Sequence, residues 1–226
     1  MGAVEPAPLL PPIREDSSSA EVSMRIQHKN AQRYRRQQER LAEDFESEEA
    51  LDKCLEGLRT GGASASDSAR MLSRMCAIAD RRDECGRRGA VPLIVEAMAG
   101  GGVDATLCCR SLSRLCAGRA DLQVQAVESG ALTALISHLQ HADTSALVLS
   151  SCRALEHMAT GRDAASRREA AATAGSLPAL VTAMRRWGEE EATRAACSAA
   201  LRSLTRDSVG LQEAATKAGA EPQWLL

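Results

Sequence analysis

Aromatic residues are scarce in this chain of 226 residues, which has two Trp, one Tyr and one Phe. Runs of β-branched residues are also nearly absent. The apolar residues, 44% of the chain, are instead rich in Ala, Leu, Met and Cys. Such side chains suit closely packed helices, because they lose little rotamer freedom there. The composition therefore predicts a globular, all-α protein with enough apolar material for a core.

Signals for export and membrane insertion are missing as well. The first dozen residues carry Glu5 and four prolines, unlike the basic start and apolar centre of a signal peptide. Met1-Gly2 resembles a myristoylation start, but Pro6 occupies the position that needs Ser or Thr. No segment approaches the roughly 20 apolar residues that span a bilayer. We therefore expect a cytoplasmic or nuclear protein without a membrane span.

Motifs for catalysis and metal binding are also absent. There is no G-x-S-x-G, P-loop or Rossmann glycine pattern, and the nearby pair His138 and His141 has no third ligand at helical spacing. The eight cysteines form no CxxC pair, and most fall in apolar helical stretches: Cys54, Cys76, Cys85, Cys108, Cys109, Cys116, Cys152 and Cys197. They are expected to be reduced, buried thiols. We predict no enzymatic activity, small-molecule substrate, cofactor or metal.

The N-terminal segments differ from the rest in composition. Residues 1–22 are rich in Pro, Ser and acidic groups and are expected to form a disordered tail. Residues 23–46 lack Gly and Pro, and their basic part, Arg25 to Arg40, precedes an acidic part. This composition predicts a charged helix, which either caps the first repeat through residues such as Leu41 and Phe45 or binds a partner.

An internal repeat begins at about residue 47. Its landmarks are four glycines spaced 41, 45 and 44 residues apart: Gly89, Gly130, Gly175 and Gly219. After the first three, apolar residues recur at offsets of two, five, six and nine, which mark one face of a helix. Three of the glycines have Pro at the third offset, where a first helical turn tolerates it. Each glycine is therefore expected to open a helix.

Two further features complete the repeat. An Asp nine or twelve residues before each glycine is expected to cap a short helix, which the glycine closes in a left-handed conformation. These residues are Asp80, Asp121, Asp163 and Asp207. Apolar i,i+3 pairs of the same period predict a third helix: Leu72 and Met75, Leu112 and Leu115, Leu155 and Met158, Leu201 and Leu204. The predicted unit is a short, a longer and a longest helix.

This pattern resembles the armadillo repeat, in its period near 42 residues, its G-x-x-P corner and a third-helix centre similar to A-L-x-N-L. The corner favours it over the related HEAT repeat. The resemblance covers residues 47–226 as about four repeats, the last one truncated. It implies a right-handed α-solenoid of three-helix repeats whose third helices line a concave groove. The stop at Leu226 marks either a minimal C-terminal cap or a piece of a longer array.

Armadillo proteins that bind extended peptides place Asn, and in importin-α also Trp, at fixed positions of the third helices. Here the Asn position is Arg74, Arg114, His157 and Ser203, and the Trp position is Arg70, Arg110, Arg153 and Ala199. The first three repeats thus each have two basic or imidazole side chains four residues apart, on one helical face. We call Arg70, Arg74, Arg110, Arg114, Arg153 and His157 the Arg ladder. It would repel a basic peptide, and we expect it to bind an acidic or phosphorylated protein segment.

The predicted function is a non-enzymatic scaffold whose protein partner binds along the groove. Three alternatives remain open. The ladder is solvated surface paired with local carboxylates; the chain is a nuclear-transport adaptor resembling importin-α, as Arg33-x-Arg35-Arg36 suggests; or it is an assembly protein that docks on an acidic polymer such as tubulin tails. Nucleic acid is not expected, because the net charge is −2 and the basic segment has Tyr34 alone as an aromatic platform.

Overall fold

The structure is a computed structural model that describes residues 48–225. The predicted tail at residues 1–22 and the predicted charged helix at residues 23–46 lie outside the described residues. The described part is helical throughout and has no strand. Its helices are α2 (Glu48–Thr60), α3 (Ala63–Met75), α4 (Ala79–Arg87), α5 (Ala90–Gly100), α6 (Ala105–Cys116), α7 (Ala120–Glu128), α8 (Ala131–His141), α9 (Ser145–Met158), α10 (Ala164–Thr173), α11 (Ser176–Trp187), α12 (Glu191–Thr205), α13 (Val209–Lys217) and α14 (Pro222–Leu225).

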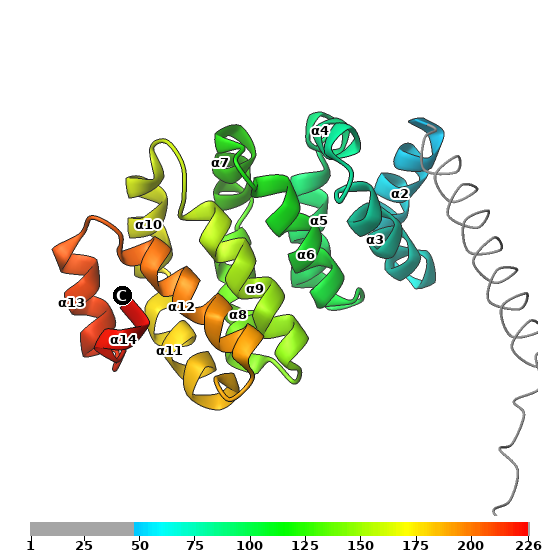
Figure 1. Cartoon of the computed structure of the whole chain (residues 1–226). Helices are drawn as coiled ribbons and strands as arrows, with labels where there is room; N and C mark the ends of the chain where they lie inside the picture. Colours follow the sequence, from blue (N-terminus) through cyan, green and yellow to red (C-terminus); the bar gives the residue numbers. More distant parts are fainter. Residues whose placement is uncertain (1–47, 226) are drawn as a thin grey trace, which may run out of the picture. The chain divides into compact units, whose positions relative to one another are not determined.

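The helices follow one another in three-helix units (Figure 1). Helices α4, α5 and α6 form one unit, α7, α8 and α9 the next, and α10, α11 and α12 the third. The first helix of each unit has 9 or 10 residues, the second 11 or 12, and the third 12 to 15. This is the predicted order of lengths. Helices α2 and α3 precede these units, and α13 and α14 follow them.

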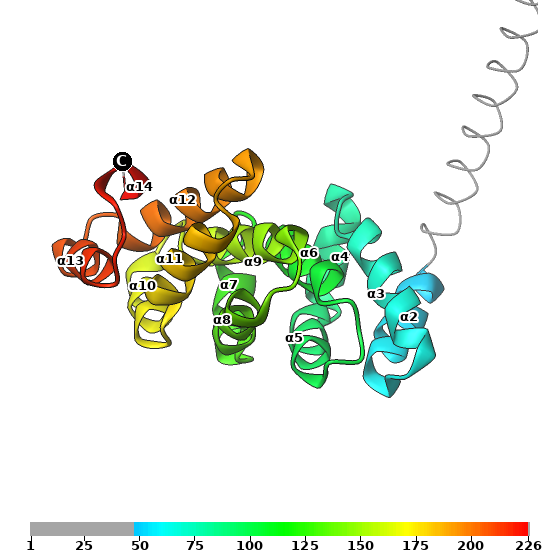
Figure 2. The same cartoon turned by 90° about the horizontal axis from the view of Figure 1, so that it is seen from below.

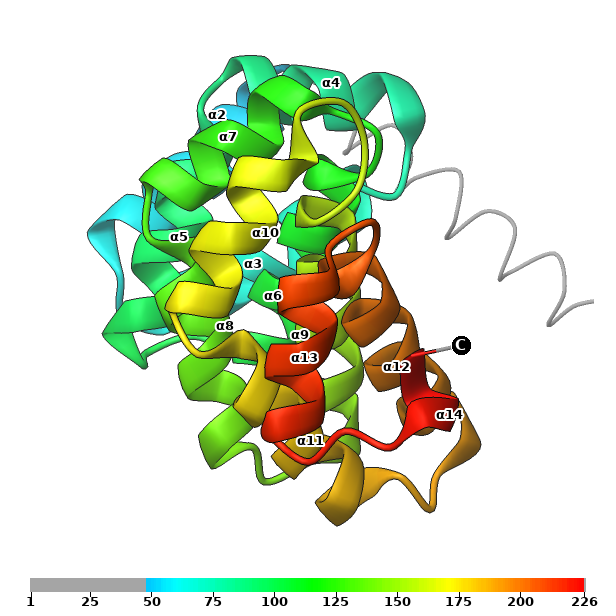
Figure 3. The ribbon, with the colours of Figure 1, turned by 90° about the vertical axis from the view of Figure 1, so that its left-hand side faces the viewer.

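The third helices form a row on one face of this solenoid. Helix α3 packs against α6, α6 against α9, and α9 against α12, so the four lie side by side (Figure 2). The view along the stack from its C-terminal end shows α13, α10, α7 and α4 receding in order (Figure 3). No helix of residues 48–225 is long and apolar enough to cross a lipid bilayer.

The first three landmark glycines open a helix as predicted, as the N-cap residues of α5, α8 and α11, whereas α14 begins only at Pro222, three residues after Gly219. Gly89, Gly130, Gly175 and Gly219 have φ angles of 75°, 88°, 96° and 95°, in the left-handed region that side chains with a Cβ disfavour. At the first of them, the Gly89 N–H donates to the Gly86 carbonyl at 3.1 Å and so closes α4. Helix α5 then begins at Ala90. The glycine thus allows the sharp change of direction between first and second helices.

The predicted Asp caps are wrong. Asp80 and Asp121 lie inside the first turns of α4 and α7, whose N-cap residues are Ile78 and Arg119. Asp163 is the N-cap of α10 but makes no capping hydrogen bond, because its backbone is left-handed, with φ of 57°. At α13 the cap is Ser208, whose Oγ accepts from the Leu211 N–H at 3.3 Å. A carboxylate in the first turn still interacts favourably with the helix dipole, which explains the places of Asp80 and Asp121.

Core packing depends on the third helices. All eight predicted apolar residues of these helices are at most 1% exposed, and burying such a side chain stabilises the fold by about 1.5–3 kcal/mol. Small side chains meet where the helices touch: Cys109 Sγ lies 3.5 Å from Ser151 Oγ, and Cys152 Sγ 3.4 Å from Cys197 Sγ. All eight cysteines are buried and free, as predicted. Side chains of this size let neighbouring third helices pack closely.

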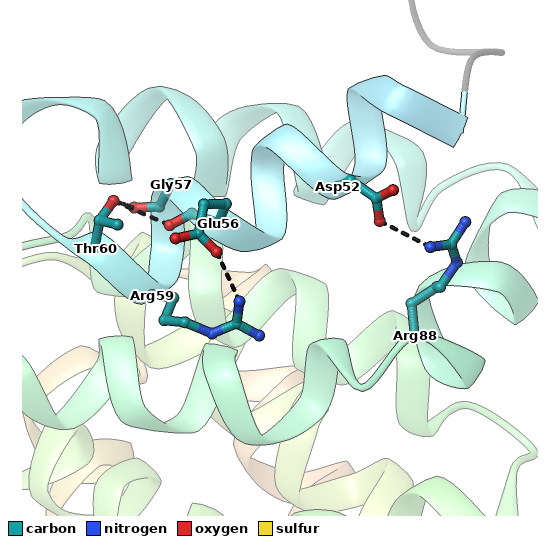
Figure 4. Close-up of polar contacts among 6 residues, drawn as sticks. All are labelled: Asp52, Glu56, Gly57, Arg59, Thr60 and Arg88. Carbon is teal, nitrogen blue, oxygen red and sulfur yellow. Dashed lines mark hydrogen bonds and ion pairs between the residues drawn. The ribbon is translucent and has the colours of Figure 1, made fainter.

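Arginines tie successive repeats together. Arg88, the C-cap residue of α4, forms an ion pair of 2.8 Å with Asp52 of α2 (Figure 4). Arg119, before α7, pairs with Asp83 of α4. Arg168 of α10 donates to the Arg206 carbonyl at 2.5 Å. Part of the arginine content of the chain is therefore structural.

Candidate functional site

The residues of the Arg ladder all project from the row of third helices. Arg70 and Arg74 belong to α3, Arg110 and Arg114 to α6, and Arg153 and His157 to α9. On α12 the equivalent positions are Ala199 and Ser203, which carry no charge. The ladder therefore spans three helices and ends before the fourth.

A hollow of about 490 Å³ lies between α6 and α9. It is lined by Arg110, Ser113, Arg114, Leu149, Ser150, Arg153 and His157. Four of the six ladder residues thus converge on one place, whereas the two arginines of α3 do not line it. No carboxylate lines it either. The positive charge of the ladder is therefore concentrated at the step from α6 to α9.

Arg114 holds the wall of this hollow in place. Its Nη1 donates to the carbonyl oxygen of Ser73, in the last turn of α3, and lies 3.4 Å from the Ser73 hydroxyl. That carbonyl is one of the group that a helix C-terminus leaves without a partner. Burial lowers the pKa of Arg114, and Arg110 adds to the shift, but a guanidinium stays charged at neutral pH. Arg114 thus connects two repeats and keeps its charge beside the hollow.

Arg110 and Arg153 form the exposed rim of the hollow. Neither guanidinium makes a hydrogen bond or an ion pair with another residue of the described part of the chain. By contrast, Arg70 lies 3.9 Å from Asp67 of its own helix, with both side chains more than half exposed. Such a pair contributes little. Arg70 is therefore paired with a carboxylate of its own helix, whereas the guanidinium groups of Arg110 and Arg153 have no partner among the described residues.

His157 is a half-buried, uncharged wall of the hollow. Burial lowers the pKa of its imidazole, Arg153 lowers it further, and Glu156 acts in the opposite direction. At pH 7 the ring is therefore mainly neutral. Its carbonyl oxygen accepts from Gln123 Nε2 at 2.9 Å and Thr160 Oγ1 at 3.0 Å. These contacts fix the end of α9 and with it the position of the ring.

Two serines and Leu149, which the sequence did not single out, complete the lining. Ser113 and Ser150 are each 6% exposed, and neither hydroxyl has a hydrogen-bond partner among residues 48–225. Each lies three residues from a rim arginine, Ser113 after Arg110 and Ser150 before Arg153, and so on the same helical face. That spacing was visible in the sequence. Their burial depends on the neighbouring helix and was not.

A second hollow, of about 640 Å³, lies between α5 and α8. Its lining is mainly apolar and includes Val95, Met98 and His138. The Nε2 atom of His138 is buried without a partner in the described region, and burial lowers the pKa of this imidazole. His141 does not line this hollow, and its Nδ1 lies 2.9 Å from the Ser137 carbonyl oxygen. Within residues 48–225, no three His, Cys, Asp or Glu side chains are placed to hold a metal ion.

Comparisons with known proteins identify the fold. No protein-family model and no curated protein matches the chain. A designed armadillo repeat protein in complex with the peptide (KR)4 is 18% identical, with a TM-score of 0.64 over 77% of this chain and 71% of that one. Another designed armadillo repeat protein is 18% identical, with a TM-score of 0.68 over 81% of this chain and 76% of that one.

Computationally designed armadillo repeat proteins for modular peptide recognition are similar too, at 19% identity and a TM-score of 0.64 over 75% of this chain and 71% of theirs. At these identities the similarity is one of fold. It agrees with the period, the glycine corners and the row of third helices described above. Residues 48–225 therefore form an all-α solenoid with the fold of armadillo repeat proteins.

Proposed function

We propose that this protein is a non-enzymatic scaffold that binds an acidic segment of a partner protein along the face of α3, α6 and α9. The observation that carries the proposal is the hollow between α6 and α9, where three arginines converge and no carboxylate is present. A bound carboxylate would receive charge-assisted hydrogen bonds, each worth about 1.5–3 kcal/mol.

The sign of the charge supports an acidic partner over a basic one. The designed protein that binds (KR)4 shares the fold, but the Arg ladder would repel such a peptide. This argues against recognition of a basic nuclear-localisation peptide. The importin-like alternative rests on Arg33, Arg35 and Arg36, which lie outside the described residues. An acidic polymer such as a tubulin tail is one specific form of the proposed partner.

Charge reversal at the rim tests this proposal. In the double variant Arg110→Glu/Arg153→Glu, both exposed rim charges change sign, so a fluorescent oligo-glutamate peptide should bind at least about tenfold more weakly, a loss of about 1.4 kcal/mol or more. Fluorescence anisotropy with the full chain measures the dissociation constant. A (KR)4 peptide should show no binding to the wild-type protein.

A matched control is Arg59→Glu/Arg87→Glu. It makes the same change in net charge, but its arginines lie on α2 and α4 and pair with Glu56 and Glu84 of their own helices. Its affinity for oligo-glutamate should stay within about twofold of wild type, since the charges that it alters lie on helices outside the row of third helices and are screened by salt. Equal losses in the two double variants would mean that net charge, rather than the ladder, governs binding.

A further inference from the structure

We propose that the hollow between α6 and α9 is a phosphoryl-binding pocket, which takes one phosphorylated side chain of the bound protein segment. This inference rests on the proposed function and makes it more specific. If the positive charge were spread evenly over the Arg ladder, the surface would favour a run of carboxylates. The structure instead concentrates charge and hydrogen-bond donors between α6 and α9.

The charge of the lining fits a dianion. Arg110, Arg114 and Arg153 are cations, His157 is mainly neutral at pH 7, and the lining includes no carboxylate. A phosphomonoester carries a charge of about −1.5 to −2 at neutral pH, whereas a Glu side chain carries −1. A single carboxylate would leave most of the positive charge of the pocket without compensation.

The hydrogen-bond donors fit a phosphoryl group as well. The rim supplies the forked guanidinium groups of Arg110 and Arg153, which match the geometry of phosphate oxygens. The hydroxyls of Ser113 and Ser150, two residues that are each 6% exposed, line the same hollow without a hydrogen-bond partner in the described region. A phosphoryl group offers three acceptor oxygens and a carboxylate two. The volume of about 490 Å³ lies within the range of pockets that enclose small ligands.

The neighbouring steps of the row lack this combination. Between α3 and α6, one N–H of Arg114 is already donated to the Ser73 carbonyl, and Arg70 lies 3.9 Å from the carboxylate of Asp67. Between α9 and α12, the equivalent positions are Ala199 and Ser203. A phosphorylated residue should therefore determine the register of the segment, while acidic residues before or after it extend toward Arg70 and Arg74.

The partner is a phosphorylated protein segment rather than a nucleic acid. Single-stranded nucleic acid binds through bases stacked on aromatic side chains as well as through its phosphates. The lining of the hollow has no aromatic residue except the imidazole of His157. A phosphoserine needs no such platform, because its recognition depends on the phosphoryl oxygens.

The test compares three peptides of one sequence, with phosphoserine, two Glu residues or Ser at the centre, in anisotropy titrations with the full chain at pH 7.5. We expect the phosphoserine peptide to bind at least about tenfold more tightly than the charge-matched Glu-Glu peptide. Equal affinity of these two peptides would contradict the phosphoryl-binding pocket but would still agree with the proposed binding of an acidic segment. Failure of all three to bind would overturn both.

Two variants separate the pocket from the rest of the face. Ser113→Ala/Ser150→Ala should weaken the phosphoserine peptide more than the Glu-Glu peptide, so that the ratio of the two affinities falls by at least about threefold. Arg70→Ala/Arg74→Ala should weaken both peptides by the same factor, because these arginines lie outside the hollow. A serine variant with unchanged preference, or an oligo-uridine of equal charge that competes as well as the phosphopeptide, would contradict the assignment. Circular dichroism melting curves check that each variant is folded.

Discussion

At the scale of single residues, arginine has two roles that the sequence does not distinguish. Arg167 of α10 is 5% exposed. It donates to the Met158 carbonyl at 2.8 Å, to Gln123 Oε1 at 2.7 Å and to the Thr160 carbonyl at 3.0 Å. Gln123 in turn donates to the Cys116 carbonyl at 2.8 Å. This network satisfies the last carbonyls of two third helices.

Replacing this buried arginine should therefore be costly. Arg167→Met would leave several buried acceptors without donors, and we expect the free energy of unfolding to fall by about 3–5 kcal/mol. Urea denaturation followed by circular dichroism measures it. Arg162→Met is the control, because Arg162 is exposed and its change should stay within about 0.5 kcal/mol. A loss below about 1 kcal/mol at Arg167 would contradict the structural role.

The buried cysteines make stability sensitive to alkaline pH. Burial raises the pKa of Cys54 and Cys109 to about 11 and that of Cys108 and Cys116 to about 12, whereas an unfolded thiol titrates near pH 8.5. Above about pH 8.5 the unfolded chain binds fewer thiol protons than the folded one, so the free energy of unfolding falls as pH rises toward 12.

Each such thiol should contribute a slope of about 1.4 kcal/mol per pH unit within this range, and none below it. Urea denaturation at pH 7.5, 9 and 10 measures the trend, and Cys108→Ala should make it shallower. The same burial predicts that a thiol reagent at pH 8 reacts slowly with the folded protein. After unfolding, the reagent should react rapidly with all eight cysteines. Rapid native labelling of several thiols would contradict the buried environment.

At the scale of helices, the landmark glycines can be tested against a glycine with ordinary geometry. Gly130 has φ of 88°, and a Cβ built there meets nothing within 4 Å. Gly130→Ala should therefore cost about 1–2 kcal/mol through backbone strain alone. Gly100, at the end of α5, also has open space around it but no positive φ. Gly100→Ala should stabilise by about 0.4–1 kcal/mol, and thermal melts compare the two. A stability change of the same sign in both variants would argue against the left-handed backbone at Gly130.

Sequence periodicity predicted these helices because the apolar residues of one helical face recur at short, regular spacings along the chain. The i,i+3 pairs such as Leu112 and Leu115 occupy the core, as their spacing requires. The Asp caps failed because a preference for Asp near a helix start does not say whether the residue lies before the first turn or inside it. The hollow between α6 and α9 could be predicted only in part. Its Arg residues follow from register, but the burial of Ser113 and Ser150 and the bond from Arg114 to Ser73 arise where repeats meet.

At the scale of the whole molecule, the charge is unevenly distributed. The chain has 28 basic and 30 acidic residues and a net charge of −2, yet the hollow between α6 and α9 is lined by three arginines and no carboxylate. Under the proposed function, this local cluster would attract an acidic segment at long range, and such attraction acts on the rate of encounter more than on the rate of dissociation.

This distribution predicts how salt changes the binding kinetics. The screening length falls from about 10 Å at 0.1 M salt to about 3 Å at 1 M. The association rate constant for an acidic peptide should therefore fall steeply over this range, while the dissociation rate constant changes less, because bonds to half-buried Arg114 are less screened. Stopped-flow fluorescence measures both. Arg110→Ala/Arg153→Ala should flatten the salt dependence of association, since it removes the exposed charges that act at a distance. Arg59→Ala/Arg87→Ala should leave it unchanged, and a similar flattening there would assign the attraction to the surface as a whole.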